Sequence, residues 1–342
     1  MNMKQIAELA GVSVATVSKI IHNYSDISEE TRAKVHEVMR QTGYVPAHTA
    51  KALAQKQTPI IGIVFAGRRH ADFAHPFFAE VLNAFQKQVG LFGYDLLFLN
   101  PDHESSGNAD YLTRCRQHRT AGCFILSGQE VGTEILALDQ SEIPCIGIDI
   151  PLHGRSSGHL MSDHANMSAK AVEHFYLLGY RELGYIGSAV ESDISGQRER
   201  GYRTALESYG LPLREEWFAG GDSFYEASGY EAMTRMIQAG SLPRAVFAAS
   251  DLLAIGALRA LREHGLRVPE EVALIGCDDI EACRYVSPSL TTIRQNKEKL
   301  GRLAASLLFD LIHNQSVASS VVVEPELVVR ESCGSRNVKV KL

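Results

Sequence analysis

The chain has 342 residues, of which 45% are hydrophobic, and its formal net charge at pH 7 is −6. This length exceeds that of one ordinary domain, so we expect two or three units with large cores. No apolar run is long enough to span a membrane, and the first segment is a charged amphipathic helix rather than a signal peptide. The sequence therefore predicts a cytoplasmic protein with no membrane partner.

The charge is unevenly distributed along the chain. Residues 1–58 hold seven Lys and Arg against five Asp and Glu, so the acidic excess lies in the remainder. Affinity for nucleic acid of any sequence rises with the number of phosphates neutralised, so one weakly basic segment would bind DNA only modestly. If this segment binds DNA, we expect two copies to act together.

The six cysteines stand singly, mainly within apolar runs. They lack the spacing of a metal site, so we expect buried, reduced thiols, with neither metal nor cofactor. They are Cys115, Cys123, Cys145, Cys277, Cys283 and Cys333.

Near the start, the sequence predicts a helix, a tight turn and a second helix. Ile6, Leu9 and Ala10 give the first helix one apolar face. Gly11 suits the turn because glycine readily adopts a left-handed conformation, and Ser13 can cap the second helix with its hydroxyl. This order is typical of a helix-turn-helix unit that reads DNA. An ordinary helical hairpin is the alternative.

The second helix has two distinct faces. Val17, Ile20 and Ile21 fall together and are expected to be buried. The opposite face begins with small side chains, so its backbone can approach base edges, and Lys19 can donate to guanine or to phosphate. We expect DNA contacts from this face and from the end of the head. The predicted contacts are Val14, Ala15, Thr16, Ser18, Lys19, His22 and Tyr44.

A third helix is expected over residues 29–42, with Ser28 as its cap. Two acidic residues near its start complement the positive end of the helix dipole. Val35, Val38 and Met39 would close a small core against the first two helices. Three helices would thus complete the unit.

The connector at residues 46–57 begins with proline and contains four alanines and a leucine, which favours helix. A helix shorter than about 12 to 15 residues is marginal in water. We therefore expect this segment to fold only against a partner copy and DNA.

From residue 60, short apolar runs alternate with amphipathic stretches, and the pattern occurs twice. Such runs predict buried parallel strands separated by helices, so we expect an α/β body of two doubly wound lobes. Strands are expected at residues 60–65, 95–99, 123–126 and 145–148, and then at 183–187, 217–218, 245–249 and 272–276. Helices of the second set are expected near 166–178, 198–209, 226–239 and 252–264.

Nine short motifs follow one another along nearly the whole chain: 6–19, 27–35, 43–46, 75–80, 248–257, 266–269, 275–279, 290–295 and 326–332. In order and spacing this series resembles the lactose-repressor (LacI/GalR) family of transcriptional regulators. The resemblance implies an all-α helix-turn-helix head and a body of type I periplasmic-binding-protein fold. It also implies a ligand in the cleft at the carboxyl ends of the strands.

The resemblance implies a division of the chain into a head, a hinge helix and two lobes. The chain would cross between the lobes near Ser162, Thr292 and Val323. The head would cover residues 1–46, the hinge 47–58, the N-terminal lobe 59–161 with 293–322, and the C-terminal lobe 162–292 with 323–336.

In the hinge, Leu53 occupies the place of a family leucine that wedges into the minor groove and bends the duplex. Packing between two hinge helices is the alternative role. Ala47 departs from the asparagine that usually follows the proline, which puts one polar contact in doubt.

Several body residues match or lie near effector-contacting positions of the family. Arg198 offers a rigid fork of donors, while Asp149 and Asp278 offer acceptors, which suits vicinal hydroxyls or a carboxylate. A sugar-like effector is therefore expected. An ion pair between Arg198 and Asp278 within one lobe is the alternative. The implied contacts are Phe77, Asp149, Arg198, Phe224, Ser250 and Asp278.

The loop before residues 75–78 is longer than is usual in the family and contains Arg68, Arg69 and His70. We predict that Arg68, Arg69 or His70 recognises an anionic effector such as a sugar acid or sugar phosphate. A solvated surface loop is the alternative.

The glycine-rich and nucleophile motifs of nucleotide-binding enzymes and hydrolases do not occur, so we expect no enzyme activity. The expected function is a repressor whose affinity for a pseudo-palindromic operator depends on the effector. A homodimer would present two recognition helices to the two half-sites. Because no leucine heptad follows residue 334, we expect a dimer rather than a tail-joined tetramer. A regulator controlled by a protein corepressor and a solute receptor without a DNA role are the alternatives.

Overall fold

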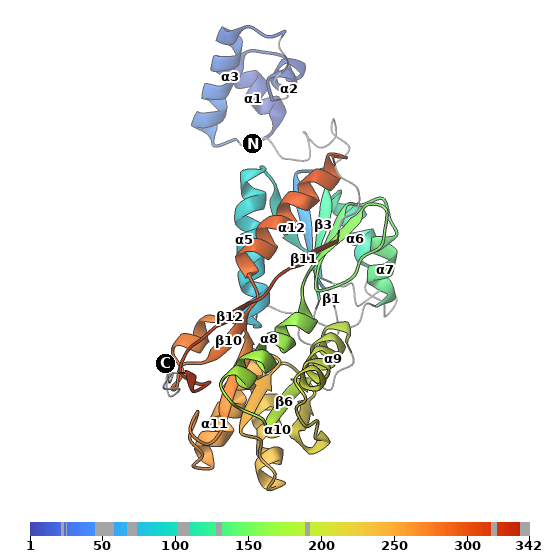
Figure 1. The fold of residues 1–342 in the computed structure, drawn as a ribbon. Coiled ribbons are helices and arrows are strands. Elements are labelled where there is room, and N and C mark those ends of the chain that lie inside the picture. The colour runs from blue at the N-terminus through green and yellow to red at the C-terminus, as the bar shows by residue number, and fades with distance from the viewer. Residues whose placement is uncertain are drawn as a thin grey trace.

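The computed structural model contains a three-helix head and a body built on two six-stranded sheets (Figure 1). The three helices of the head precede the first strand, and the two sheets share the remainder of the chain. The structure describes residues 1–21, 24, 26–44, 58–66, 74–100, 110–127, 132–188, 192–315 and 320–335.

The head has well-formed helix ends. Ser13 Oγ accepts from the backbone N–H of Thr16 at 3.0 Å, and Ser28 caps the third helix through the N–H of Thr31. Gly11 and Gly43 both end helices with positive φ, 64° and 63°, which glycine adopts without strain. The helices are α1 (Met3–Ala10), α2 (Val14–Ile21) and α3 (Glu29–Thr42).

The core of the head differs from the prediction chiefly at one position, while Ile21 and Val38 pack against this core and are only partly buried. Leu9 is 58% exposed, and the predicted apolar face of α1 is wrong there. Ala7 is buried instead, because the face of α1 that meets the other helices is centred between Ile6 and Ala10. The core residues are Ile6, Ala7, Ala10, Val17, Ile20, Val35 and Met39.

The first sheet is entirely parallel, with strand order β11-β5-β4-β3-β1-β2. Helices α5 and α12 cover one face, and α6 and α7 cover the other (Figure 1). Gly301 allows α12 to lie close against α5, since a Cβ there would meet the carbonyl oxygen of Val81 at 2.3 Å. The strands are β1 (Ile60–Ala66), β2 (Asp95–Phe98), β3 (Gly122–Ser127), β4 (Cys145–Ile148), β5 (Ser157–Ser162) and β11 (Ser320–Val323). The helices are α5 (Pro76–Leu91), α6 (Tyr111–His118), α7 (Thr133–Asp139) and α12 (Lys297–Ile312).

The second sheet has the order β12-β10-β9-β8-β6-β7, and only β12 runs antiparallel to its neighbour. Its helices pack in pairs, α8 beside α9 and α10 beside α11. The strands are β6 (Leu183–Ser188), β7 (Phe218–Gly221), β8 (Ala245–Ala248), β9 (Ala273–Asp278), β10 (Thr291–Arg294) and β12 (Glu326–Val328). The helices are α8 (His164–Leu177), α9 (Asp193–Ser208), α10 (Glu226–Gln238), α11 (Asp251–Glu263), and the 3-10 turns η1 (Glu215–Trp217) and η2 (Glu281–Arg284).

The chain passes between the two lobes three times: from β5 to α8, from β10 to α12, and from β11 to β12. Ile293 and Arg294 still pair with β9, so the chain leaves that sheet after Arg294, two residues beyond Thr292, near which the crossing was expected. The strand expected at residues 217–218 begins one residue later, because Trp217 closes the turn η1. All six cysteines are buried, and none forms a disulfide.

Candidate functional site

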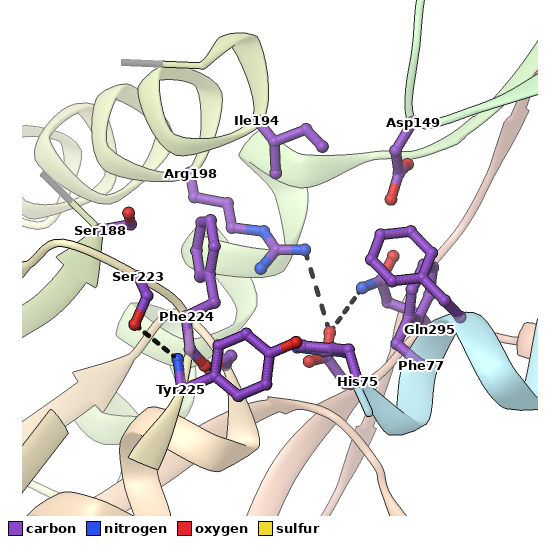
Figure 2. Close-up of a pocket in the computed structure, with 13 residues that line it drawn as sticks. His75, Phe77, Asp149, Ser188, Ile194, Arg198, Ser223, Phe224, Tyr225 and Gln295 are labelled. Atoms are coloured by element: carbon purple, nitrogen blue, oxygen red, sulfur yellow. Dashed lines mark hydrogen bonds and ion pairs between the residues drawn. The ribbon is translucent and has the colours of Figure 1, made fainter. Parts of the chain in front are cut away.

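A cleft lies where the carboxyl ends of strands from both sheets meet the start of α5 (Figure 2). The empty space in and in front of the cleft amounts to about 590 Å³, open solvent included. The polar groups come mainly from strand ends, the usual location of ligands in open α/β sheets. The lining residues are His75, Phe77, Phe78, Asp149, Ser188, Ile194, Arg198, Ser223, Phe224, Tyr225, Ser250, Asp278 and Gln295.

Two carboxylates of the cleft sit on strained backbone. Asp149 directly follows β4 and has a φ of 56°, and Asp278 ends β9 with a φ of 117°. Side chains other than glycine rarely adopt such values, and they persist where the surrounding structure holds them. Both carboxylates line the space between the sheets, as Figure 2 shows for Asp149.

Arg198, on α9, is the cation at the centre of the cleft, and it is buried. One terminal N–H donates to the carbonyl oxygen of Ala249. The other terminal nitrogen lies 3.9 Å from Asp278 Oδ1, which makes an ion pair but is too long for a hydrogen bond. The ion pair left open by the sequence is thus present, and both partners still line the cleft.

The buried imidazole of His164 joins Arg198 to Asp149. Arg198 Nε donates to His164 Nδ1 at 3.3 Å, and His164 Nε2 lies 3.1 Å from Asp149 Oδ1. Because a guanidinium can only donate, Nδ1 must accept and the ring proton must lie on Nε2. His164 therefore donates to the carboxylate of Asp149.

Gln295, just after β10, has a buried amide that contacts Asp278. Its Nε2 donates to Asp278 Oδ1 at 2.6 Å, and this fixes the orientation of the amide because a carboxylate only accepts. Among the described residues, nothing donates to its Oε1, although that atom is buried. A buried acceptor without a donor costs free energy, so this oxygen is a natural contact for a ligand.

Lys297 fixes the crossing that follows Gln295. Its ammonium donates to the carbonyl oxygens of Asp278 and Asp279 at 2.9 and 2.7 Å and pairs with Glu80 on α5 at 3.3 Å. One cation thus links the end of β9 to the opposite lobe.

Aromatic rings form the walls of the cleft. The Arg198 guanidinium lies 5.6 Å from the Phe224 ring, and Phe77 packs edge-on against Phe78. His75 on the α5 side contacts Tyr225 of the other lobe, with ring centroids 5.5 Å apart. The walls therefore combine apolar faces with a few convergent polar groups, as in typical ligand sites.

Six of the eight residues expected to contact an effector line this cleft. Ser250 is one of them, but its hydroxyl donates to the carbonyl of Phe224 and caps α11, so it positions the aromatic ring. Arg69 and His70 lie outside the described residues, as does Arg68. The lining residues that sequence reasoning missed are His75, Phe78, Ser188, Ile194, Ser223, Tyr225 and Gln295.

The recognition face of the head is only partly as expected. Val14, Ala15 and Lys19 are exposed, and Thr16 and Ser18 are half-buried. Tyr44 packs partly against the core of the head. His22 and Leu53 lie outside the described residues.

Among the described residues, no group of three or more His, Cys, Asp or Glu side chains is arranged to hold a metal ion. In the same part of the chain, no helix has the length and apolar character needed to cross a bilayer.

Two family descriptions match this chain: "Bacterial regulatory proteins, lacI family" over residues 2–47, and "Periplasmic binding protein-like domain" over residues 172–333. The chain is 33% identical over 338 residues to the HTH-type transcriptional repressor PurR of Proteus mirabilis, and the match covers 96% of both chains. The relative is thus a repressor rather than an enzyme.

Solved structures agree with these matches. The lac repressor dimer bound to operator and the anti-inducer ONPF has a TM-score of 0.84 and 25% identity, covering 97% of this chain and 99% of the other. A complex of the transcriptional regulator CelR with cellobiose has a TM-score of 0.72 and 28% identity, with the same coverage. The chain therefore belongs to the lacI family of bacterial regulatory proteins and is a helix-turn-helix transcriptional repressor.

Proposed function

We propose that this repressor binds a small uncharged polyhydroxyl compound of the sugar class in the cleft, and that this ligand changes its affinity for operator DNA. The observation that carries the proposal is the surplus of acceptors among the described lining residues. Asp149, Asp278 and Gln295 Oε1 all offer acceptors, whereas two of the three nitrogens of Arg198 already donate to protein groups and the third faces Asp278 at 3.9 Å without a hydrogen bond. A donor-rich ligand would complete this set.

A sugar hydroxyl suits the gap between Arg198 and Asp278 because it both accepts and donates. It can accept from the terminal nitrogen of Arg198 and donate to the carboxylate, whose mutual distance of 3.9 Å leaves both groups available. The apolar faces of Phe77 and Phe224 can cover the C–H surface of a pyranose ring. The similar structure of CelR was solved with cellobiose, which supports a carbohydrate.

An anionic ligand is less well supported by the described residues. Two carboxylates in the cleft would repel it, and the charge of Arg198 is already balanced in part by Asp278. Recognition of an anion would need Arg68, Arg69 or His70, so that hypothesis becomes an outcome of the test below.

The effector can act only by favouring one arrangement of the lobes over another. Phe77 and Asp149 lie in one lobe, and Arg198, Phe224 and Asp278 lie in the other, so a ligand held by both sets favours one spacing between them. We propose that this spacing sets the position of the hinge segment, residues 47–58, and thereby the affinity for operator.

The proposal includes a homodimer acting in the cytoplasm on a pseudo-palindromic operator. One head, residues 1–46, has five Lys and Arg against five Asp and Glu and so no net positive charge, and two copies would double the number of phosphates contacted. Within each chain of the dimer, the two lobes would be joined by the crossings after Ser162, Arg294 and Val323.

A calorimetric screen tests the effector class. Neutral sugars, sugar acids, sugar phosphates and nucleobases are titrated into the full chain, and operator affinity is measured with each compound that binds. We expect a neutral sugar to bind and to change operator affinity. Binding of only a sugar acid or sugar phosphate, lost in Arg68→Ala and Arg69→Ala, would replace this proposal with the anionic one. Control seen only with added protein extract would indicate a corepressor.

A further inference from the structure

The recognition helix presents its lysine already paired with an acid. Lys19 Nζ contacts the carboxylate of Asp26, which lies in the loop between α2 and α3. The two side chains are 46% and 53% exposed, so the ion pair lies on the surface of the head. The Lys19 hydrogen bond lowers the pKa of Asp26, so this acid remains ionised at neutral pH.

Lys19 points away from the core of the head. Val17 and Ile20 form the buried side of α2, whereas Ala15 and Lys19 are exposed. A DNA groove that receives this exposed side of α2 therefore meets Asp26 together with Lys19. The carboxylate of Asp26 would then lie close to the negatively charged backbone of the DNA.

The ion pair affects the two kinds of DNA contact differently. An ammonium has three donors, so Lys19 can donate one hydrogen to guanine O6 or N7 while another stays on Asp26. A phosphate oxygen can accept from the same ammonium, but Asp26 then places a second anion beside the backbone. Its repulsion of the phosphate offsets the attraction of Lys19, so the pair as a whole neutralises little charge.

We infer that Asp26 is a specificity-determining residue of the head: by holding the Lys19 ammonium, it disfavours phosphate contacts and permits base contacts. Asp26 thereby lowers affinity for DNA of arbitrary sequence more than affinity for the operator. The inference depends on the repressor activity of the chain and on contact between Lys19 and DNA, and it does not depend on the effector.

The test compares Asp26→Asn with Glu37→Gln in the full chain. Both changes remove one negative charge per head and release one cation, since Glu37 pairs with Arg40 on α3 at 2.6 Å. A duplex selected from random sequence by the unaltered protein serves as operator, and a random-sequence duplex of equal length as competitor. Affinities are measured over a series of salt concentrations.

We expect Asp26→Asn to raise affinity for the random duplex several-fold and affinity for the selected duplex by less. The specificity ratio, which is the affinity for the selected duplex divided by that for the random duplex, should therefore fall. The slope of log affinity against log salt should steepen by about 0.9 per head, the effect of one phosphate neutralised. Glu37→Gln should leave the specificity ratio unchanged. Equal shifts in the two variants would show a general charge effect and overturn the inference, as would an unaltered slope in Asp26→Asn.

A Lys19→Met background separates the pair from the acid alone. If Asp26 acts through Lys19, then Asp26→Asn has no effect on the specificity ratio in this background. A fall as large as in the unaltered protein would overturn the inference. If Lys19→Met itself leaves binding to both duplexes unchanged, contact between Lys19 and DNA is absent and the inference fails at that step.

Discussion

Asp149 and Arg198 contact opposite nitrogens of one buried imidazole, that of His164. Asp149 follows β4 in the first sheet, and Arg198 lies on α9 against the second. His164 begins α8, immediately after the first crossing between lobes. The cleft residues of the two lobes are thus connected through a side chain at the crossing, so a ligand that moves Asp149 also acts on Arg198.

We predict that His164→Leu uncouples the two lobes. It leaves the Asp149 carboxylate and Arg198 Nε without their shared partner, so the free energy of unfolding should fall by about 3 kcal/mol. The change in operator affinity caused by the effector should also shrink. Urea unfolding and binding titrations with and without effector measure the two effects.

His164→Gln is the matched control for that change. A glutamine amide can accept from Arg198 and donate to Asp149, in the same order as the imidazole. We expect it to retain more of the stability and the response than His164→Leu. Equal losses in both variants would show that packing of the ring, rather than its two hydrogen bonds, is what matters.

Arg198→Ala should abolish the response to effector and spare operator binding by the ligand-free protein. The substitution removes the donor that faces Asp278 and leaves both His164 Nδ1 and the Ala249 carbonyl without a partner. Arg198→Lys should also fail, because an ammonium cannot reproduce the planar fork. Footprinting with and without effector checks this, and a normal response in either variant would refute the assigned role.

Leu53→Ala should weaken operator binding and leave effector affinity unchanged. The expectation comes from the sequence, in which Leu53 lies in the hinge segment at the place of the groove-inserting leucine. Loss of the wedge removes the bend and the contacts that the bend permits. Affinity for the selected duplex and the bend angle in a gel assay are the measurements, and an unaltered bend would favour simple helix packing.

Elements with strong local signals were predicted closely. The third helix begins after Ser28 and ends before Gly43, where a side-chain cap and a left-handed glycine mark its limits. Strand β4 coincides with the apolar run at residues 145–148. Leu9 was misplaced because apolar spacing alone does not say which side of a short helix meets its partners.

The lining residues that directly follow apolar strands were predicted, and those brought into the cleft by the chain crossings were missed. Asp149 and Asp278 stand directly at apolar strand ends, which a sequence reveals. Gln295 and His75 come together only through chain crossings between residues more than two hundred positions apart, and β10 has few apolar residues to reveal it. His75 lies in the motif at 75–80 and Gln295 in the motif at 290–295, so these motifs were the signal that could have identified them as lining residues.

A last prediction concerns pH. Asp251, at the start of α11, is fully buried, and burial followed by the nearby charge of Asp278 raises its pKa from 3.8 to about 7. The folded state then holds a proton that the unfolded state has lost between about pH 4 and pH 7. The contribution of this group to stability is complete below about pH 4 and is lost as pH rises through about 7.

Asp251→Asn removes this dependence. The amide oxygen can accept from the N–H of Ile280, and the amide nitrogen can donate to the Thr292 hydroxyl, which now accepts. The variant should therefore gain stability relative to the unaltered protein as pH rises from 4 to 7, and the difference should be constant above that range. Urea unfolding at a series of pH values measures it.

Thr292→Val provides the complementary test. The Thr292 hydroxyl donates to Asp251 Oδ1 and lowers the pKa of that carboxyl, in opposition to burial. Its removal should raise the pKa of Asp251 in the folded state above 7. Stability should then continue to fall at pH values where the unaltered protein has reached its plateau. If the plateau begins at the same pH in Thr292→Val, a group other than Asp251 causes the loss of stability between about pH 4 and pH 7.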